Sequence, residues 1–261
     1  MNNFIERTLS GILFVAVLVV GITWSTDTCM YLFALISLLM IREFSLLIDQ
    51  SGRTSLPSAL CLSGALLAFG LDNERWMVVY AVFILILFIA ELYRRQEHAI
   101  ENWAFIALTQ LYIALPLALV NVLTRHTPHY ALPLAVFVFI WLNDTGAYCV
   151  GSLVGKTPLF QRISPKKSWE GTCGGAAFAM ISAVVFYSVF PELLSVMQWI
   201  GLSVIVVIFG TWGDLVESLL KRKLNIKDSG NFLPGHGGIL DRFDSSLLAI
   251  PAAVLYLYLV T

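Results

Sequence analysis

Two aspartates three positions apart, among basic and glycine residues, mark residues 227–244 as the segment best suited to chemistry. Asp241 and Asp244 would lie about 60° apart on one helix face. The helix dipole would explain one aspartate in a first turn. It does not explain two of them beside an apolar span, together with the segment's other polar residues: Lys227, Asp228, His236 and Arg242. Gly235, Gly237 and Gly238 would let the backbone approach a ligand closely. The segment therefore predicts a ligand-binding site.

A second polar face is predicted where the apolar stretch 196–220 ends. Asp214, Glu217, Ser218 and Lys221 fall within roughly 100° of one another on a helix. Arg222 follows them directly. Asp214 and Lys221 could simply balance each other's charge, because charged residues within a membrane commonly pair. The alternative is a polar site at the end of this span.

Asp144 follows the uncharged run 130–143 and should lie well inside a span. An ionised aspartate near the bilayer centre costs about 2.5 to 3.5 kcal/mol, so such a residue is usually functional or paired. Tyr148, Gly151 and Gly155 share its helix face. That stripe is either a close-packed seam of small residues or the polar lining of a cavity.

An anion site is predicted at the start of the seventh apolar stretch. Ser164 is the expected N-cap and Pro165 the first helical residue. Free backbone N–H groups at a helix start bind anions, and Lys166 and Lys167 would add two positive charges. Lys156 is not part of a P-loop, because the first glycine of that motif is missing; it is expected to contact phosphate as a loop cation.

Together these residues favour a metal-assisted reaction on phosphates. Carboxylates without cysteine ligands, and with a single nearby histidine, favour Mg²⁺ over zinc. Clustered Lys and Arg imply phosphate groups. The natural reaction class is therefore phosphoryl or nucleotidyl transfer. A Ser-His-Asp hydrolase is disfavoured, because the chain lacks a G-x-S-x-G nucleophile elbow.

The elements that position these residues are predicted to be membrane spans. Of the 261 residues, 58% are hydrophobic and 13% are charged, against about 25% charged in a typical soluble domain. Apolar stretches lie near 8–25, 29–48, 56–71, 76–93, 103–123, 130–150, 171–190, 196–220 and 239–260. A span needs about 20 mainly apolar residues, so the expected fold is an all-α polytopic membrane helix bundle of about nine transmembrane helices. We expect a single membrane domain, 1–261, with N-terminal spans in 1–130 and catalytic spans and cytoplasmic loops in 131–261.

The distribution of basic residues predicts the orientation. With a cytoplasmic N-terminus, fourteen of them fall on the inside and only Arg75 and Arg125 on the outside. The fourteen are Arg7, Arg42, Arg53, Arg94, Arg95, Lys156, Arg162, Lys166, Lys167, Lys221, Arg222, Lys223, Lys227 and Arg242. Cytoplasmic loops of membrane proteins carry an excess of Lys and Arg. The polar segments are therefore expected on the cytoplasmic side.

The polar segments resemble the signature of phosphatidate cytidylyltransferases, also called CDP-diacylglycerol synthases. The matching residues are Ser218-x-Leu220-Lys221-Arg222, Lys227-Asp228-x-Gly230 and Leu233-Pro234-x-His236-Gly237-Gly238-Ile239-x-Asp241-Arg242-Phe243-Asp244. The upstream blocks are similar too: Asp144-x-x-Ala147-Tyr148-x-x-Gly151-x3-Gly155-Lys156 and Ser164-Pro165-Lys166-Lys167-Ser168-Trp169-Glu170-Gly171, where Ser168 replaces the more usual Thr. The resemblance is specific from about 140 to 245 and rests on hydropathy before that.

The resemblance implies the reaction of CTP with phosphatidate to give CDP-diacylglycerol and pyrophosphate, using Mg²⁺, in a dimeric nine-helix protein. It also implies that Asp214 and Asp241 hold the metal. Asp144 and Asp244 are expected to support that cluster, and His236 is either a proton shuttle or a structural residue. The residues expected to contact the substrates are Lys156, Ser164, Lys166, Lys167, Ser218, Lys221, Arg222, Lys227, Asp228, Gly237, Gly238 and Arg242.

Two other functions remain open on the sequence. An ion-coupled transporter would also carry intramembrane aspartates and Gly-interrupted helices, although no internal repeat relates the two halves. A CTP-dependent lipid kinase would move the γ-phosphate and not CMP. Short loops and the lack of a transit peptide favour a bacterial inner membrane, and no nucleic-acid partner is expected. The sequence leaves open a second, monovalent cation.

Overall fold

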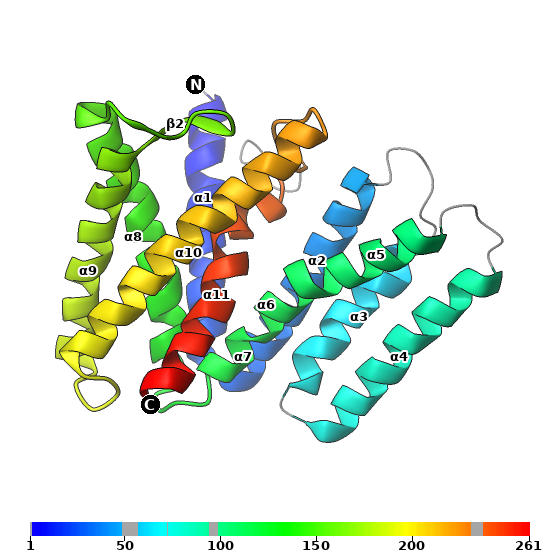
Figure 1. Cartoon of the computed structure of the whole chain (residues 1–261). Coiled ribbons are helices and arrows are strands. Elements are labelled where there is room, and N and C mark those ends of the chain that lie inside the picture. Colours follow the sequence, from blue (N-terminus) through cyan, green and yellow to red (C-terminus); the bar gives the residue numbers. More distant parts are fainter. Residues whose placement is uncertain (1, 49–56, 72, 94–98, 231–236) are drawn as a thin grey trace. The chain divides into compact units, whose positions relative to one another are not determined.

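The computed structural model describes residues 2–48, 57–71, 73–93, 99–230 and 237–261, and these are almost wholly helical (Figure 1). Long apolar runs form helices in a membrane because every backbone polar group must be hydrogen-bonded within the segment. The long helices are α1 Asn2–Trp24, α2 Thr26–Ile48, α3 Pro57–Gly70, α4 Glu74–Tyr93, α8 Ala131–Val154, α9 Trp169–Val189, α10 Val196–Lys223 and α11 Leu240–Val260.

The fifth apolar stretch forms four short helical pieces. These are α5 Ala99–Thr109, the π-helix η1 Gln110–Ala114, α6 Leu115–Ala118 and α7 Val120–Leu123. Pro116 lies in α6 and has no backbone N–H to donate, which accounts for an interrupted hydrogen-bond ladder here.

Seven helices of the described chain are long and apolar enough to cross a membrane: α2, α4, the 99–123 segment, α8, α9, α10 and α11. Two shorter apolar helices, Ser10–Trp24 and Ala59–Gly70, lie in α1 and α3. The prediction of an all-α polytopic membrane protein is thus confirmed.

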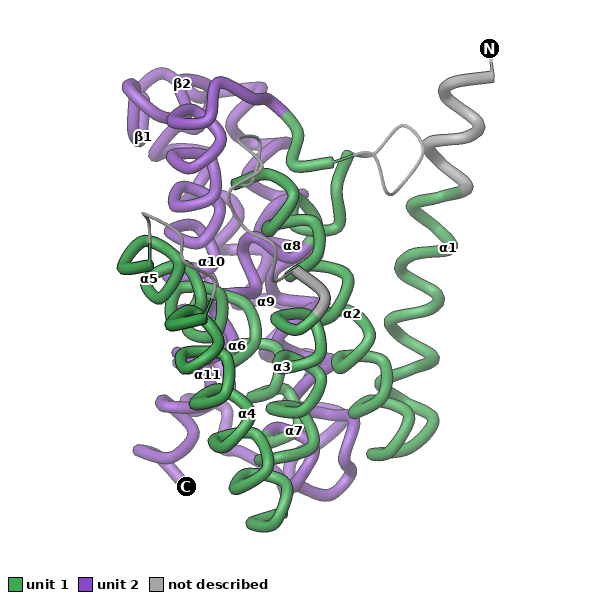
Figure 2. The backbone as a smooth tube through the Cα atoms, turned by 90° about the vertical axis from the view of Figure 1, so that its right-hand side faces the viewer, with its two compact units in different colours: residues 1–122, 228–242 green, residues 123–227, 243–261 purple. Residues whose placement is uncertain are grey.

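The chain divides into two compact units, which Figure 2 colours separately. Unit 1 comprises residues 1–122 and 228–242, and unit 2 comprises residues 123–227 and 243–261. The core of unit 1 is aromatic where α2 meets α5, because the fully buried Phe44 stacks on Phe105 with ring centroids 5.6 Å apart. In unit 2 the buried Trp199 of α10 contacts Phe139 of α8 and Phe186 of α9.

A short β-hairpin precedes α9 in unit 2. Strands β1 Pro158–Phe160 and β2 Ser164–Ser168 pair antiparallel, with Pro158 opposite Ser168. The prediction that Ser164 caps the helix and Pro165 begins it is wrong. Helix α9 starts at Trp169, and its N-cap is Ser168, whose hydroxyl accepts a hydrogen bond from the Gly171 N–H at 3.1 Å. The φ that proline imposes also suits an extended strand, so Pro165 does not by itself mark a helix start.

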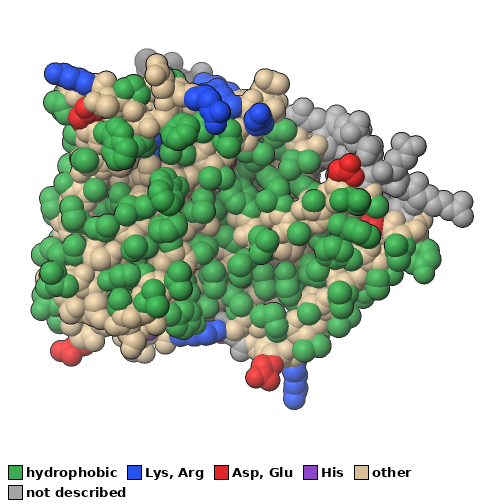
Figure 3. All heavy atoms as spheres, in the orientation of Figure 1, with side chains coloured by type: hydrophobic (Ala, Val, Ile, Leu, Met, Phe, Trp, Pro, Cys, Tyr) green, Lys and Arg blue, Asp and Glu red, His purple; other side chains and the backbone are tan. Residues whose placement is uncertain are grey.

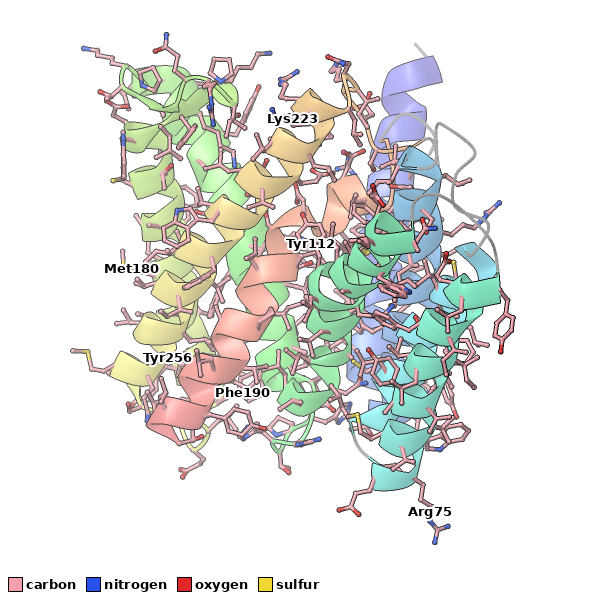
Figure 4. All side chains as sticks on the ribbon, turned by 45° about the vertical axis from the view of Figure 1, so that its right-hand side comes forward. Arg75, Tyr112, Met180, Phe190, Lys223 and Tyr256 are labelled. Carbon is pink, nitrogen blue, oxygen red and sulfur yellow. The ribbon has the colours of Figure 1, made fainter. Side chains whose placement is uncertain are left out.

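Unit 2 has apolar sides and charged ends. Hydrophobic side chains cover the surface over α9 and α10, while Lys and Arg gather at the end that carries the hairpin (Figure 3). Ile181 and Val189 on α9 are 65% and 60% exposed, as expected for side chains that face lipid. Lys223 lies at one end of unit 2, and Phe190 and Tyr256 lie at the other (Figure 4).

Candidate active site

A cavity of about 280 Å³ with charged side chains in its lining opens in unit 2 beside the hairpin. Three helices and one strand supply its lining. The lining residues are Asn143, Asp144, Ala147 and Tyr148 from α8, Lys166, Lys167 and Ser168 from β2, Gly171 and Thr172 from α9, and Thr211 and Asp214 from α10. Four of the residues predicted from the sequence therefore share one cavity: Asp144, Lys166, Lys167 and Asp214.

Asp214 is the best-connected carboxylate of this cavity. Its Oδ2 pairs with Nζ of Lys167, and its Oδ1 accepts a hydrogen bond from the Ser218 hydroxyl at 3.1 Å. Both members of the ion pair keep about a quarter of their side chains exposed, 28% for Lys167 and 26% for Asp214. The pair is therefore open to a ligand that enters the cavity.

Lys221 has a different partner. Its ammonium lies 2.8 Å from the carboxylate of Glu217, a residue that is fully buried one turn earlier on α10. The interpretation that Asp214 and Lys221 merely balance each other stays a prediction, since each of them also has another ionic partner, Lys167 for Asp214 and Glu217 for Lys221. Glu217 holds Lys221 at the polar end of α10.

Three aspartates from three helices interact electrostatically in unit 2. Asp144 on α8 interacts with Asp214 on α10 and with Lys167. Asp244 on α11 interacts with both of these aspartates and with Lys221. Like charges brought together in this way repel one another, and a nearby cation relieves the repulsion. The group is therefore suited to a cation.

The donor chemistry of this group fits Mg²⁺. All three side chains offer hard carboxylate oxygens, the ligands that Mg²⁺ prefers, and Mg²⁺ in proteins commonly takes only one or two carboxylates together with substrate phosphates. In the part of the chain that the structure describes, no three acidic, His or Cys side chains come close enough to surround an ion by themselves. A metal bound by these carboxylates would therefore need further ligands, which substrate phosphates could supply.

The helix face that carries Asp144 was predicted to be either a cavity lining or a close-packed seam, and it is both. Asp144 and Tyr148 line the cavity. Further along the same face, Gly151 meets α9, where a Cβ added at Gly171 would lie 3.1 Å from the Gly151 Cα and 2.8 Å from the Ala147 carbonyl oxygen. The small residues therefore let α8 and α9 approach closely, and that contact sets the position of the aspartate.

Glu170 anchors the turn between α8 and the hairpin. Its carboxylate accepts hydrogen bonds from the backbone N–H groups of Lys156 and Thr157, each at 3.1 Å, and from the Thr157 hydroxyl at 2.8 Å.

Lys156 and Ser164 are not among the residues that line the cavity. Arg222 and Lys227, on α10 and just after it, complete the predicted residues of unit 2.

Asp241 belongs to unit 1, in the first turn of α11. Its Oδ2 accepts hydrogen bonds from the backbone N–H groups of Ser229 at 2.8 Å and Gly238 at 2.9 Å. Gly237 has a φ of +81° and lies so close that an added Cβ would be 2.8 Å from the same oxygen. Asp228 and Arg242 lie in unit 1 as well. His236 lies outside the described residues.

Sequence reasoning missed Glu43. The structure places it against residues 228–230 and 237–241 of the signature, which are called the signature segment below. Its carboxylate accepts hydrogen bonds from the Ile239 N–H at 2.9 Å and the Leu240 N–H at 3.0 Å. The available signal was the adjacent charged pair Arg42-Glu43 inside the apolar stretch 29–48. An intramembrane charge is a functional candidate by default.

The chain is similar to known cytidylyltransferases over nearly its full length. The model of the cytidylyltransferase family matches residues 5–260. Phosphatidate cytidylyltransferase of Bacillus subtilis (strain 168) is 37% identical over 185 residues, which are 70% of this chain and 68% of that protein. The proteins of that name from Staphylococcus haemolyticus (strain JCSC1435) and Staphylococcus aureus (strain COL) are 46% and 45% identical over 123 residues, 47% of this chain and 46% of each relative.

Proposed function

This chain belongs to the cytidylyltransferase family, and we propose that it makes CDP-diacylglycerol and pyrophosphate from CTP and phosphatidate, with the substrate phosphates bound in the cavity of unit 2. It is an integral membrane nucleotidyltransferase of phospholipid biosynthesis. The observation that carries the site is the convergence of Lys166, Lys167, Asp144 and Asp214 on one cavity beside apolar helices.

In the proposed reaction a phosphate oxygen of phosphatidate attacks the α-phosphorus of CTP. The new P–O bond forms as the bond to the β-phosphate oxygen breaks, and pyrophosphate leaves with that electron pair. A phosphate monoester is already anionic, so no protein nucleophile is required. The enzyme's contribution to such a transfer is positioning and electrostatic stabilisation.

The cavity provides positive charge for that purpose. Lys166 and Lys167 lie on β2, and the Asp214 carboxylate holds the Lys167 ammonium within the cavity. Lysine binds phosphate as a point charge, so the two residues would attract and orient the CTP phosphates. When bound, Mg²⁺ would neutralise charge on the phosphates. Assignment of Asp241 to the same metal as Asp214 rests on the sequence resemblance and stays a prediction.

We further propose nine spans, a homodimer and a cytoplasmic site in a bacterial inner membrane. Support for the orientation comes from unit 2, where Lys and Arg gather at the hairpin end (Figure 3). The fourteen-to-two division of basic residues supports the same orientation for the whole chain.

Cysteine labelling tests this topology. A cysteine at Gln96 or Asn231 should react with a membrane-impermeant maleimide from the cytoplasmic side, and one at Asn73 or His126 only from the opposite side. The native cysteines must first be replaced, because Cys149 and Cys173 are exposed. Labelling of all four positions from one side would contradict the nine-span topology.

The function itself is tested with the purified protein in lipid vesicles. CDP-diacylglycerol should form when CTP and phosphatidate are both present and not when either is omitted. Failure to form it in the complete mixture, with folded protein, would contradict the proposal.

A further inference from the structure

Glu43 lies at the centre of a hydrogen-bond network that joins α2 to the signature segment within unit 1. Its Oε1 accepts from the Ser229 hydroxyl at 2.5 Å and from the Leu240 N–H at 3.0 Å. Its Oε2 accepts from the Ile239 N–H at 2.9 Å. Ser229 and Leu240 are 186 and 197 positions away in sequence, so this is a tertiary contact.

Two glycines of the signature make room for this carboxylate. A Cβ added at Gly238 would collide with Glu43 Oε1 and with the Ser229 hydroxyl. A Cβ added at Gly230 would lie 2.7 Å from Glu43 Oε2. Such distances are too short for real atoms, so a side chain at Gly230 or Gly238 would have to displace the end of the Glu43 side chain.

The network also connects Glu43 to Asp241. The Ser229 hydroxyl lies 2.5 Å from Glu43 Oε1 and 3.0 Å from Asp241 Oδ2. A hydroxyl has one proton to donate, so Ser229 serves one of the two carboxylates at a time and keeps both close to itself. Glu43 meanwhile accepts two N–H groups at the start of α11, where the helix dipole favours a negative charge.

We propose that Glu43 is a positioning residue for cytidylyl transfer: it fixes the first turn of α11 and, through Ser229, the orientation of Asp241. This inference rests on the proposed function. Glu43 touches neither substrate in this account and acts through the residues that it holds. The competing explanation is that Glu43 only stabilises the fold, as any carboxylate that caps a helix would.

Hydrogen exchange tests the network without reference to activity. In E43Q the amide of the new side chain would face backbone N–H donors in place of one carboxylate oxygen. Deuterium uptake of the peptide that contains Ile239 and Leu240 should therefore rise at least about tenfold in rate. A matched control is E91Q, since Glu91 is another hydrogen-bonded glutamate of unit 1: it is 3% exposed and accepts from the Asn102 amide at 3.0 Å. E91Q should leave the 237–244 peptide unchanged.

Kinetics then separates positioning from stability. A misplacement of about 1 Å in a catalytic group can cost about a hundredfold in rate. We therefore expect E43Q to lower kcat about tenfold to a hundredfold while the KM for CTP changes less than about threefold, with a thermal midpoint no lower than that of E91Q. E43D keeps the charge and should recover part of the lost kcat.

A double mutant tests the close contact between Gly238 and Glu43. G238A alone should lower kcat strongly, because its methyl group collides with Glu43 and Ser229. In the E43A background the same change should cost several-fold less, because one of the two colliding groups is gone. Equal losses in both backgrounds would contradict the steric contact.

Each outcome can be told apart. Unchanged exchange in E43Q would overturn the network. Raised exchange with wild-type kcat would overturn the positioning role and leave Glu43 as a stabilising cap. A wild-type protein that forms no CDP-diacylglycerol would overturn the proposed function, and the exchange result would still decide whether Glu43 holds the segment.

Discussion

Replacement of Asp214 by Asn should lower turnover at least about a hundredfold, the size of effect seen when one electrostatic contact to a transition state is lost. The side chain keeps its volume, but the negative charge that pairs with Lys167 disappears from the cavity. Lys167 then loses its partner, and the carboxylates of Asp144 and Asp244 lose the third member of their group. Insertion should not suffer, because removing a charge lowers the cost of placing α10 in the bilayer.

The matched control for Asp214→Asn is Glu192→Gln. It makes the same change of charge in unit 2, in an exposed turn outside the cavity, and should turn over CTP at the wild-type rate. The measurement is the initial rate at saturating CTP and phosphatidate, with monodispersity in detergent as the check of folding. A folded Asp214→Asn protein with near wild-type turnover would remove Asp214 from the site.

Asp241→Asn extends this test to the metal assignment. If Asp214 and Asp241 hold one Mg²⁺, as the sequence resemblance implies, each single mutant should lose nearly all turnover. The double mutant should then be little worse, because residues that act as one unit are strongly non-additive. Two modest losses that multiply in the double mutant would show that the two aspartates act separately.

Removal of divalent metal should abolish turnover. The cavity holds Asp144 and Asp214 together with two lysines, and the phosphates of both substrates would add negative charge to it. We expect EDTA to reduce turnover below about 1% of its initial value, since a metal can contribute several kcal/mol to such a transfer. Excess Mg²⁺ should restore the rate.

The control for chelation is EDTA already saturated with Mg²⁺, which should leave the rate unchanged. Ca²⁺ in place of Mg²⁺ should support turnover poorly, because it takes more ligands at longer distances and with looser geometry. Full turnover in excess free EDTA would refute the metal requirement.

The apolar stretches and the cavity residues were predictable because local chemistry determines them. Each stretch of mainly apolar residues contains helix in the structure, since the bilayer leaves the backbone few alternatives. Asp144 and Asp214 stood out because a carboxylate in an apolar run needs a reason. In the structure both aspartates line one cavity with Lys166 and Lys167, and their catalytic roles stay predictions.

Two features could not be predicted from the sequence, for physical reasons. The start of α9 was misplaced because Ser164 and Ser168 are both acceptable caps, and only the pairing of β2 with β1 decides between them. The hydrogen bonds of Glu43 to Ile239 and Leu240 could not be predicted, because these partners are nearly two hundred positions away in the sequence. A local pattern identifies which residues are unusual, but it does not reveal which distant segment folds against them.

The most direct test of the account follows the phosphorus of CTP. Purified protein in phosphatidate-containing vesicles would receive CTP labelled at the α-phosphorus in one sample and at the γ-phosphorus in another, both with Mg²⁺. Cytidylyl transfer predicts that the α-label enters the lipid fraction and the γ-label leaves as pyrophosphate. Entry of the γ-label into lipid, with release of CDP, would show a CTP-dependent lipid kinase and contradict the account.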